Sequence, residues 1–217
     1  MRSLSLSFNL SSGPKILCLG AHSDDIEIGC GGTILRLLQD YPNCTLHWVV
    51  FSAVGVRETE AQRAAELFAG TAVVGGPHLK AFRDGFMPFV GAEVKTVFEE
   101  LKQGVSPDLI FTHNRKDAHQ DHRLLAELTW NTFRDHLILE YEIPKYDGDM
   151  GQPGFFVPIS LELCEKKVQY LMEAFPSQRS KRWFQPETFL ALMRLRGMEC
   201  NAPSGYAEAF YGRKMIL

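Results

Sequence analysis

The sequence predicts an α/β protein with a Rossmann-like, doubly wound fold, in which helices cover both faces of a mostly parallel sheet. Short apolar runs alternate with helical patterns from Lys15 to Phe133, and the apolar runs are continuous rather than alternating. Continuous apolar strands indicate a sheet buried on both faces, which is typical of parallel strands joined by helices. With 217 residues, 45% of them hydrophobic, the chain can bury a core. We expect one domain over residues 1–217, with residues 140–217 as an elaborated C-terminal part over the pocket.

The first elements follow from apolar spacing. Lys15–Gly20 (KILCLG) is an apolar run that ends at a glycine, and residues 34–41 (ILRLLQDY) place apolar side chains on one helical face. We therefore expect a strand, a glycine-containing turn and a helix that starts near Gly32. A second strand is predicted over 44–53 (CTLHWVVFSA), followed by a helix over 58–70 (ETEAQRAAELFAG).

The pattern continues with a third short strand predicted over 71–76 (TAVVGG) and a helix over 90–104. The β-rich run 108–113 (DLIFTH) predicts another strand, and a helix follows over 123–133. Glycines, prolines and aromatic residues over 141–160 favour a loop above the pocket rather than regular structure throughout.

Composition narrows the class of protein. The net charge of −3 and the absence of a basic stripe argue against a nucleic-acid or anionic-membrane partner and favour a small molecule. The five cysteines are odd in number and form no CxxC pair, which argues against a disulfide framework and a thiolate zinc site. The N-terminal segment MRSLSLSFNLSSGPK has no continuous apolar region, and no later segment approaches the ~20 apolar residues of a membrane span. We expect a cytoplasmic protein.

Two clusters of polar residues follow predicted strands. The segment 20–33 (GAHSDDIEIGCGGT) follows the first strand, and the segment 113–123 (HNRKDAHQDHR) follows the strand that begins at Asp108. Ligands of open α/β sheets bind beyond the carboxyl ends of the strands. Both clusters can therefore open onto one edge of the sheet.

Each cluster combines histidine and aspartate at short spacing, as His22-x-x-Asp25 and His119-x-Asp121-His122. Such a density of charge beside a core is costly unless a cation offsets it. Two imidazoles and a carboxylate with an open fourth position are the ligand set of a catalytic zinc. We therefore predict a metal site.

Other interpretations exist for single residues. Asp24 and Asp25 could cap the next helix, and Asp121 could cap the helix that follows it. GCGGT could form a phosphate-binding turn, but it lacks the GxGxxG spacing and no lysine follows as in a P-loop. None of these accounts explains why the two clusters follow two strands of one predicted sheet.

The two motifs resemble those of the PIG-L/LmbE family of metal-dependent N-acetylglucosaminyl deacetylases. AHSDDIEIGCGGT is similar to the family signature AHPDDE…GCGGT, and HQDH is similar to its HxDH signature. The segments KILCLGAH, AQRAAE, RDGFM and YAEAFYGRKM also resemble family segments. Ser23 stands where the family usually has proline, and Asp117 stands where some members have tyrosine.

This resemblance implies a Rossmann-like fold with one divalent metal, zinc or alternatively Fe²⁺, and hydrolysis of the acetamido group of an amino sugar. The implied metal ligands are His22, Asp25 and His122. Asp24 would be the general base, and the imidazolium of His119 would stabilise the oxyanion, with Asp121 as its carboxylate partner. Arg63 and Asp84 stand where relatives contact the sugar.

The substrate is less closely defined than the reaction. A glycoside, a glycan precursor or a nucleotide sugar fits the resemblance, and the alternative for Arg63 is an exposed helix residue. Arg179, Lys181 and Arg182 beside Trp183 could hold a diphosphate or stack on a sugar, although a solvated cluster is the commoner arrangement. A homo-oligomer is compatible with the sequence. The alternative function is a non-catalytic Rossmann-like module that binds a metal or a nucleotide, but a purely structural metal site does not need Asp24.

Overall fold

The computed structural model describes residue 8 and residues 13–215. It shows one seven-stranded sheet with the strand order β3-β2-β1-β4-β5-β7-β6. The first five strands in this order are parallel, and β7 runs antiparallel to both of its neighbours. The strands are β1 (Lys15–His22), β2 (Thr45–Ser52), β3 (His78–Leu79), β4 (Leu109–His113), β5 (Ile138–Tyr141), β6 (Phe155–Pro158) and β7 (Ala207–Gly212).

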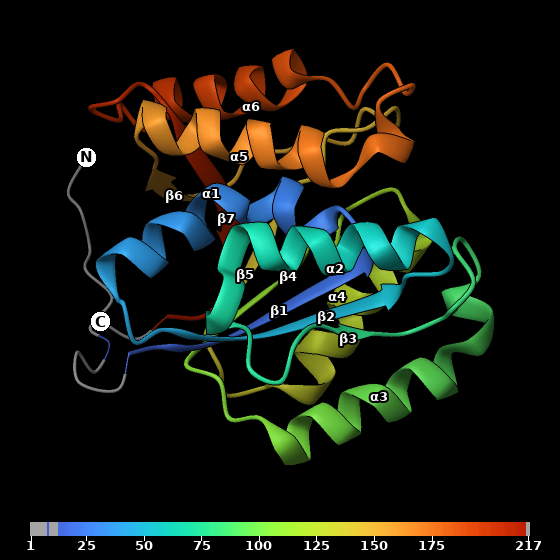
Figure 1. Cartoon of the computed structure of the whole chain (residues 1–217). Coiled ribbons are helices and arrows are strands. Elements are labelled where there is room, and N and C mark those ends of the chain that lie inside the picture. The colour runs from blue at the N-terminus through green and yellow to red at the C-terminus, as the bar shows by residue number, and fades with distance from the viewer. Residues whose placement is uncertain (1–7, 9–12, 216–217) are drawn as a thin grey trace.

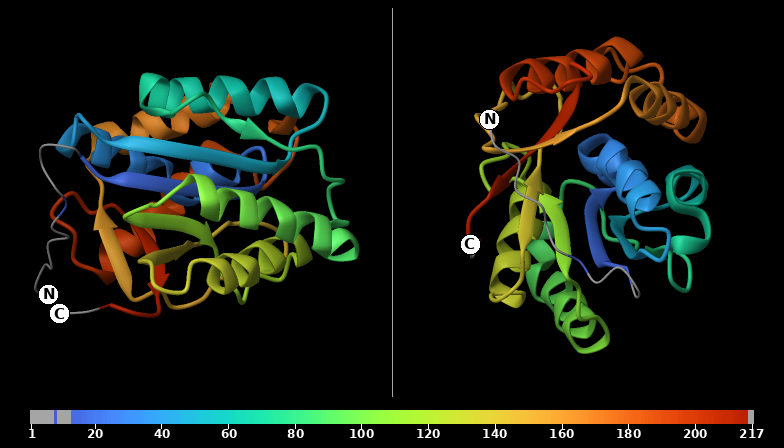
Figure 2. Two further views of the ribbon diagram at one scale, coloured as in Figure 1. Left: turned by 90° about the horizontal axis from the view of Figure 1, so that it is seen from below. Right: turned by 90° about the vertical axis from the view of Figure 1, so that its left-hand side faces the viewer.

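Helices cover both faces of this sheet, so the predicted α/β class with a mostly parallel, Rossmann-like sheet is confirmed. Helices α1, α2, α5 and α6 form one layer, and α3 and α4 pack together on the opposite side, as Figures 1 and 2 show. The helices are α1 (Asp25–Asp40), α2 (Val56–Ala69), α3 (Gly91–Gly104), α4 (Gln120–Thr132), α5 (Leu161–Ala174) and α6 (Pro186–Glu199). Three short 3₁₀ helices are η1 (Gly70–Ala72), η2 (Met87–Val90) and η3 (Pro176–Gln178).

The apolar run of the central strand β1 is continuous because both faces of this strand are covered. Ile16 and Cys18 belong to the core cluster beneath α1, α2 and α5, whereas Leu17 and Leu19 belong to the cluster beneath α3 and α4. All four side chains are fully buried. Because successive residues of a strand face opposite sides, a strand covered on both sides needs apolar residues at every position.

The glycines after the first strand lie inside a helix, so the prediction of a turn with a helix starting near Gly32 was wrong. Helix α1 begins at Asp25 and includes all of GCGGT. A Cβ atom at Gly29 would overlap the ring of Tyr141, and one at Gly31 would overlap the ring of Phe68. These glycines therefore serve close packing of α1 against its neighbours, at a cost in helix propensity.

One other local prediction was also wrong, and another holds for most of its segment. The segment 71–76 forms most of η1 and a single bridge between Val73 and Leu46, and the third strand is β3 further along the chain. The segment 141–160 contains the end of β5 and the whole of β6, and its other residues, 142–154 and 159–160, form neither strand nor helix, as the predicted loop requires.

The C-terminal part completes the sheet and one helical layer. Residues from 155 onward supply β6, α5, α6 and β7, and α5 packs on α1 and α2. Among the residues that the structure describes, no helix is both long enough and apolar enough to cross a membrane. Most of the N-terminal segment behind the targeting expectation, residues 1–7 and 9–12, lies outside the described residues. The single-domain organisation stays a prediction.

Candidate metal centre

The two motifs meet where the order of strands reverses. The chain runs outward from β1 to β2 and β3 and then returns to place β4 on the other side of β1. Strand β1 ends at His22, the adjacent strand β4 ends at His113, and α1 and α4 begin just after these ends. This switch point is where open α/β sheets bind their ligands.

The three predicted metal ligands lie within contact of one another. His22 Nδ1 is 3.1 Å from His122 Nε2 and 3.3 Å from Asp25 Oδ2, and His122 Nε2 is 3.6 Å from Asp25 Oδ1. Donors at about 2.0–2.1 Å from a tetrahedral zinc ion are separated by about 3.4 Å. The donor set and its spacing therefore fit a divalent metal.

A carboxylate behind His122 sets the orientation of its ring. His122 Nδ1 lies 3.0 Å from Asp117 Oδ2, so the N–H at Nδ1 donates to Asp117 and Nε2 is free to face the other two ligands. Burial, together with the nearby His113, lowers the pKa of His122 to about 4. The imidazole is therefore neutral near pH 7, which is the form that binds a metal.

Asp117 is itself held in place. Its Oδ1 accepts a hydrogen bond from the backbone N–H of His119 at 2.8 Å and lies 3.0 Å from Lys145 Nζ. Burial would raise the pKa of Asp117, but the hydrogen bond from His122 and the charge of His122 outweigh it, so the pKa is well below its usual range. Asp117 therefore stays ionised behind the ring of His122.

Asp25 is buried among three histidines. Burial acts to raise the pKa of Asp25, but the charges of His122, His113 and His22 outweigh it and hold this pKa well below its usual range. His113 Nε2 lies 3.2 Å from Asp25 Oδ2, and the His113 ring stacks on that of His122 with centroids 3.9 Å apart. The hydroxyl of Tyr141 also lies 3.2 Å from His113 Nε2.

Asp24 is close to these ligands but is not one of the three. Its Oδ1 accepts a hydrogen bond from Arg57 Nη2 at 2.6 Å. Burial raises the pKa of Asp24, and the charge of Arg57 opposes this rise. Arg57 also donates to Glu60 at 2.7 Å, and Glu60 accepts from the backbone N–H of Ser177 in η3 at 2.8 Å.

His119 and Asp121 lie at the centre but are arranged differently from the expectation. Asp121 accepts backbone N–H groups of Gly85 at 2.7 Å and Met87 at 3.1 Å, and its Oδ2 lies 3.3 Å from His22 Nε2. It therefore orients His22 and the loop before η2 rather than His119. Burial and the charge of His22 lower the pKa of His119, so this arrangement favours a neutral His119 instead of the expected imidazolium.

The two predicted sugar contacts separate in the structure. Asp84 Oδ1 lies 3.0 Å from His22 Nε2, and its side chain is 75% exposed, so Asp84 is at the outer side of the centre. Arg63 is on the exposed side of α2, where it pairs with Glu66 at 2.8 Å and Glu173 at 2.7 Å. The structure thus brings Arg57, and not Arg63, to the cluster.

The basic segment 179–183 makes local contacts. Arg179 donates to the backbone carbonyl of Met172, and Lys181 Nζ lies 5.7 Å from the centre of the Trp183 ring. A contact of these side chains with a substrate stays a prediction.

Three residues near the centre were not assigned by the sequence reasoning: Arg57, Asp117 and His113. Asp117 and His113 belong to the second polar cluster, and Asp117 could have been recognised by its position two residues before His119. Arg57 lies three residues before Glu60 at the start of α2, a spacing that places both on one helical face.

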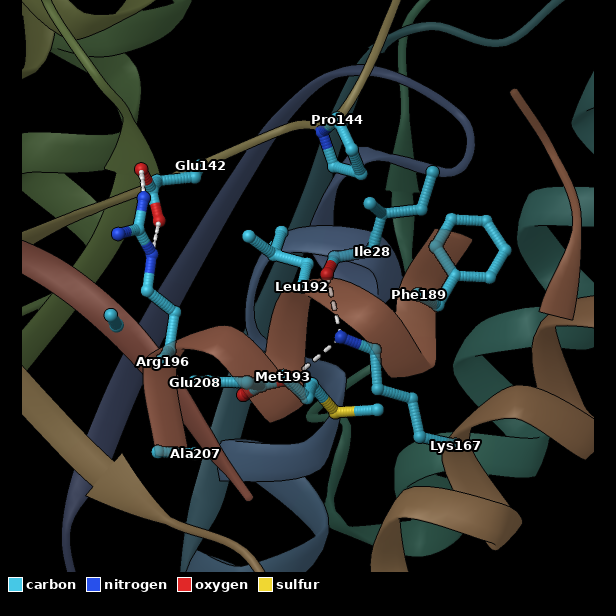
Figure 3. Close-up of a pocket in the computed structure, with 12 residues that line it drawn as sticks. Ile28, Glu142, Pro144, Lys167, Phe189, Leu192, Met193, Arg196, Ala207 and Glu208 are labelled. Carbon is cyan, nitrogen blue, oxygen red and sulfur yellow. Dashed lines mark hydrogen bonds and ion pairs between the residues drawn. The ribbon is translucent and has the colours of Figure 1, made fainter. Parts of the chain in front are cut away.

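A pocket behind α1 (Figure 3) is lined by paired charges. Lys167 donates to the carbonyl of Ile28 and to Glu208, both at 2.6 Å. Glu208 also accepts the backbone N–H groups of Gly32 at 2.8 Å and Thr33 at 2.6 Å. We interpret this ion pair as a link that holds α1 against α5 and β7.

Comparisons with known proteins identify the family of this chain. A family model described as PIG-L, GlcNAc-PI de-N-acetylase, matches residues 17–133, which is more than half of the chain. This match confirms the resemblance stated from the two motifs.

Solved structures share the fold at low sequence identity. An N,N'-diacetylchitobiose deacetylase from Pyrococcus horikoshii, complexed with its inhibitor MPG, has a TM-score of 0.71 and 20% identity, covering 95% of this chain and 87% of that chain. The conserved protein TT1542 from Thermus thermophilus has a TM-score of 0.75 and 21% identity, covering 94% and 96%. GalB, the 4-carboxy-2-hydroxymuconate hydratase from Pseudomonas putida KT2440, has a TM-score of 0.67 and 18% identity, covering 94% and 98%. Since a deacetylase and a hydratase share this fold, the fold alone does not select the reaction.

Proposed function

We propose, because this chain belongs to the PIG-L family of GlcNAc-PI de-N-acetylases, that it is a metal-dependent hydrolase that removes the N-acetyl group from an N-acetylglucosamine-type amino sugar. The products would be the free amine and acetate. The observation that carries this proposal is the spacing of His22, Asp25 and His122, with donor atoms 3.1–3.6 Å apart, beside a fourth buried group, Asp24, that is not one of the three.

The metal would be held by His22, Asp25 and His122, and zinc or Fe²⁺ suits a set of two imidazoles and one carboxylate. When bound, it supplies Lewis acidity toward the amide carbonyl and toward the attacking water. Asp117 and Asp121 would fix the rings of His122 and His22, since each carboxylate lies within 3.3 Å of a ring nitrogen.

Asp24 is the proposed general base. Its carboxylate accepts the proton of the attacking water, and the resulting carboxylic acid can return that proton to the leaving nitrogen. Arg57 stabilises the ionised form of Asp24 through its hydrogen bond at 2.6 Å. This arrangement keeps a buried carboxylate able to accept a proton near neutral pH.

His119 and Asp84 are proposed to contact the substrate. As a neutral imidazole, His119 can donate an N–H group to the oxyanion that forms from the amide carbonyl. Its Nδ1 is buried and has no hydrogen-bond partner among the described residues. Asp84, with its exposed carboxylate, can accept hydrogen bonds from sugar hydroxyl groups.

The test combines metal analysis with a chemical assay for free amines. The purified protein should contain about one divalent metal per chain and should release amine and acetate in equal amounts from at least one N-acetylglucosamine derivative. The panel would include the methyl glycoside, N,N'-diacetylchitobiose and a nucleotide sugar. A metal-loaded protein that releases no amine from any of them would contradict the proposal and favour a non-catalytic binding module.

A further inference from the structure

Lys145 is a nearly buried lysine beside the candidate metal centre. It lies in the segment 142–154, which connects β5 to β6 and forms neither strand nor helix. Its side chain is 10% exposed, and its Nζ lies 3.0 Å from Asp117 Oδ1 and 2.5 Å from Asp149 Oδ2. Lysine is almost never buried unless its charge is paired. The two carboxylates therefore account for the burial of this ammonium group.

The Asp117 carboxylate connects this ammonium group to a proposed metal ligand. Its Oδ2 accepts a hydrogen bond from His122 Nδ1 at 3.0 Å. Its Oδ1 accepts the backbone N–H of His119 and faces Lys145. The other ring nitrogen, His122 Nε2, lies 3.1 Å from His22 Nδ1. Because one carboxylate makes all these contacts, its orientation determines where His122 Nε2 points.

Lys145 supplies a contact that no neighbouring basic residue replaces. In the part of the chain that the structure describes, no other lysine or arginine pairs with the Asp117 carboxylate. The nearby Arg123 donates instead to the backbone carbonyl of Asp117 at 2.9 Å. Without Lys145, Oδ1 of Asp117 would retain only its hydrogen bond from the backbone of His119. One hydrogen bond restrains a carboxylate less than a hydrogen bond and an ion pair together, so the Asp117 side chain would gain freedom to rotate.

The segment that carries Lys145 is anchored by contacts of its own. Arg196 in α6 pairs with Glu142 at 2.7 Å, as Figure 3 shows, and donates to the backbone carbonyl of Gly151 at 3.0 Å. Glu142 and Gly151 lie on either side of Lys145 in the chain. The backbone around Lys145 is therefore held independently of the lysine side chain, and a substitution of that side chain should leave the segment in place.

We infer that Lys145 is a positioning residue of the metal centre. This inference rests on the metal centre of the proposed function. The ammonium group of Lys145 holds the Asp117 carboxylate, and this carboxylate holds the ring of His122 with Nε2 toward the other ligands. Groups that orient a metal ligand from outside typically change metal affinity about 10- to 100-fold when they are removed. Lys145 thus raises the affinity for a divalent metal without contacting it.

The charge of Lys145 and its position predict opposite effects on metal binding. A cation repels a nearby divalent cation, so loss of the charge alone would tighten metal binding. Loss of positioning would weaken metal binding, because the ring of His122 would no longer be held in one orientation. The direction in which the metal dissociation constant changes therefore identifies the role of Lys145.

The first experiment measures the zinc affinity of the full chain by competition with a chelator. Lys145→Met should raise the zinc dissociation constant about tenfold. The matched control is Lys116→Met, which removes the same charge next to Asp117 in the chain. Lys116 is exposed and its ammonium group forms no ion pair with a described residue, so this variant should change the dissociation constant by about twofold or less. An unchanged or lower dissociation constant in Lys145→Met would overturn the inference.

A second variant keeps the test valid if Lys145→Met does not fold. Lys145→Gln retains a hydrogen-bond donor but has no charge and a shorter side chain, so it should raise the zinc dissociation constant about threefold or more. Urea unfolding of the metal-free proteins shows which variants are folded. A folded Lys145→Gln protein with the zinc affinity of the wild type would overturn the inference.

A double-mutant cycle tests whether Lys145 acts through Asp117. If it does, Lys145→Met should change the zinc dissociation constant by about twofold or less in a protein that already carries Asp117→Asn. The two losses would then not be additive. If they add in full, Lys145 acts on the centre by a route that does not include Asp117, and the inference is overturned.

Activity measurements separate failure of this inference from failure of the proposed function. If the wild type releases amine but Lys145→Met binds zinc equally well, the inference fails and the proposed function stands. If no substrate releases amine but zinc affinity depends on Lys145 as expected, the proposed function fails and the inference stands. A wild type that binds no divalent metal overturns both. A higher KM in Lys145→Met with unchanged zinc affinity would indicate a substrate contact, which also overturns the inference.

Discussion

Arg57 Nη2 lies 2.6 Å from Asp24 Oδ1, so a guanidinium from α2 is paired with the carboxylate that we propose as the base. Burial raises the pKa of Asp24, and the positive charge of Arg57 limits that rise. The pair therefore links the start of α2 to the protonation of a group at the start of α1.

The first prediction concerns the pH dependence of the wild type and of Arg57→Gln. A base acts in its deprotonated form, so kcat/KM should fall as the pH falls through the pKa of Asp24. Loss of the Arg57 charge raises that pKa, so the fall should begin at higher pH in Arg57→Gln. Profiles of kcat/KM against pH measure this shift, and Arg63→Gln, on the exposed side of the same helix, is the control. An acidic limb that stays in place in Arg57→Gln would contradict the assignment.

The second prediction separates the base from the ligands. Asp24→Asn keeps the shape of the side chain but cannot accept the proton, so kcat should fall about 10²- to 10⁴-fold. Metal content and KM should stay close to the wild-type values, because Asp24 is not one of the three proposed metal donors. Metal analysis and steady-state kinetics on the same sample check both points. Near-normal turnover with metal bound would refute the role of Asp24.

The third prediction compares a ligand with its support. His122→Ala removes a donor, so the variant should remain folded but lose most of its bound metal. Asp117→Asn leaves the donor in place and removes only the carboxylate that accepts from His122 Nδ1, so metal affinity should fall about 10- to 100-fold. Competition with a chelator measures the two affinities. Unfolding of metal-free His122→Ala would indicate a structural metal instead.

The fourth prediction tests the packing of α1. A methyl group at Gly29 would overlap the Tyr141 ring, so Gly29→Ala should lower the free energy of unfolding by about 1–3 kcal/mol or more. Gly91 begins α3, and a Cβ atom added there would meet no other atom within 4 Å. Gly91→Ala should therefore leave stability unchanged or raise it by up to about 1 kcal/mol. Urea unfolding measures both, and equal effects would contradict the packing argument.

The fifth prediction concerns the buried ion pair behind α1. Lys167→Met leaves the Glu208 carboxylate buried without its cation and should lower the free energy of unfolding by about 3–5 kcal/mol. The double variant Lys167→Met with Glu208→Gln should recover part of this loss. Lys166→Met, at the neighbouring and partly exposed position, should change stability by about 0.5 kcal/mol or less. If Lys167→Met were as stable as Lys166→Met, the ion pair between Lys167 and Glu208 would not contribute to the free energy of unfolding.

The sequence predicted the sheet and the site region because both depend on local signals. Strands β1, β2 and β4 are buried on both faces, so their apolar runs are continuous and can be read directly. His22, Asp25 and His122 lie in dense polar motifs at strand ends, and the sheet topology then brings them together. These features need no knowledge of distant contacts.

The features that the sequence did not predict depend on contacts between distant segments. Position 29 of α1 needs a glycine because the ring of Tyr141 packs against the helix there, and nothing near Gly29 in the chain indicates that ring. Arg57 was overlooked in favour of Arg63 because the choice depends on which side of α2 faces Asp24. Asp121 has two backbone donors from the loop at Gly85, so its partner could not be inferred from the HxDH spacing.

The contacts of Glu208, the partner of Lys167, determine when α1 can complete its folding during synthesis. Glu208 accepts the amides of Gly32 and Thr33 across 176 and 175 positions of sequence. A ribosome-bound chain that has been synthesised through α4 already contains both motifs, but it lacks the carboxylate that fastens α1 and the strand that carries it. Helix α1 can thus reach its final contacts only after β7 has emerged. Binding of the proposed metal by nascent chains should consequently come late in synthesis, after the C-terminal strand is free to join the sheet.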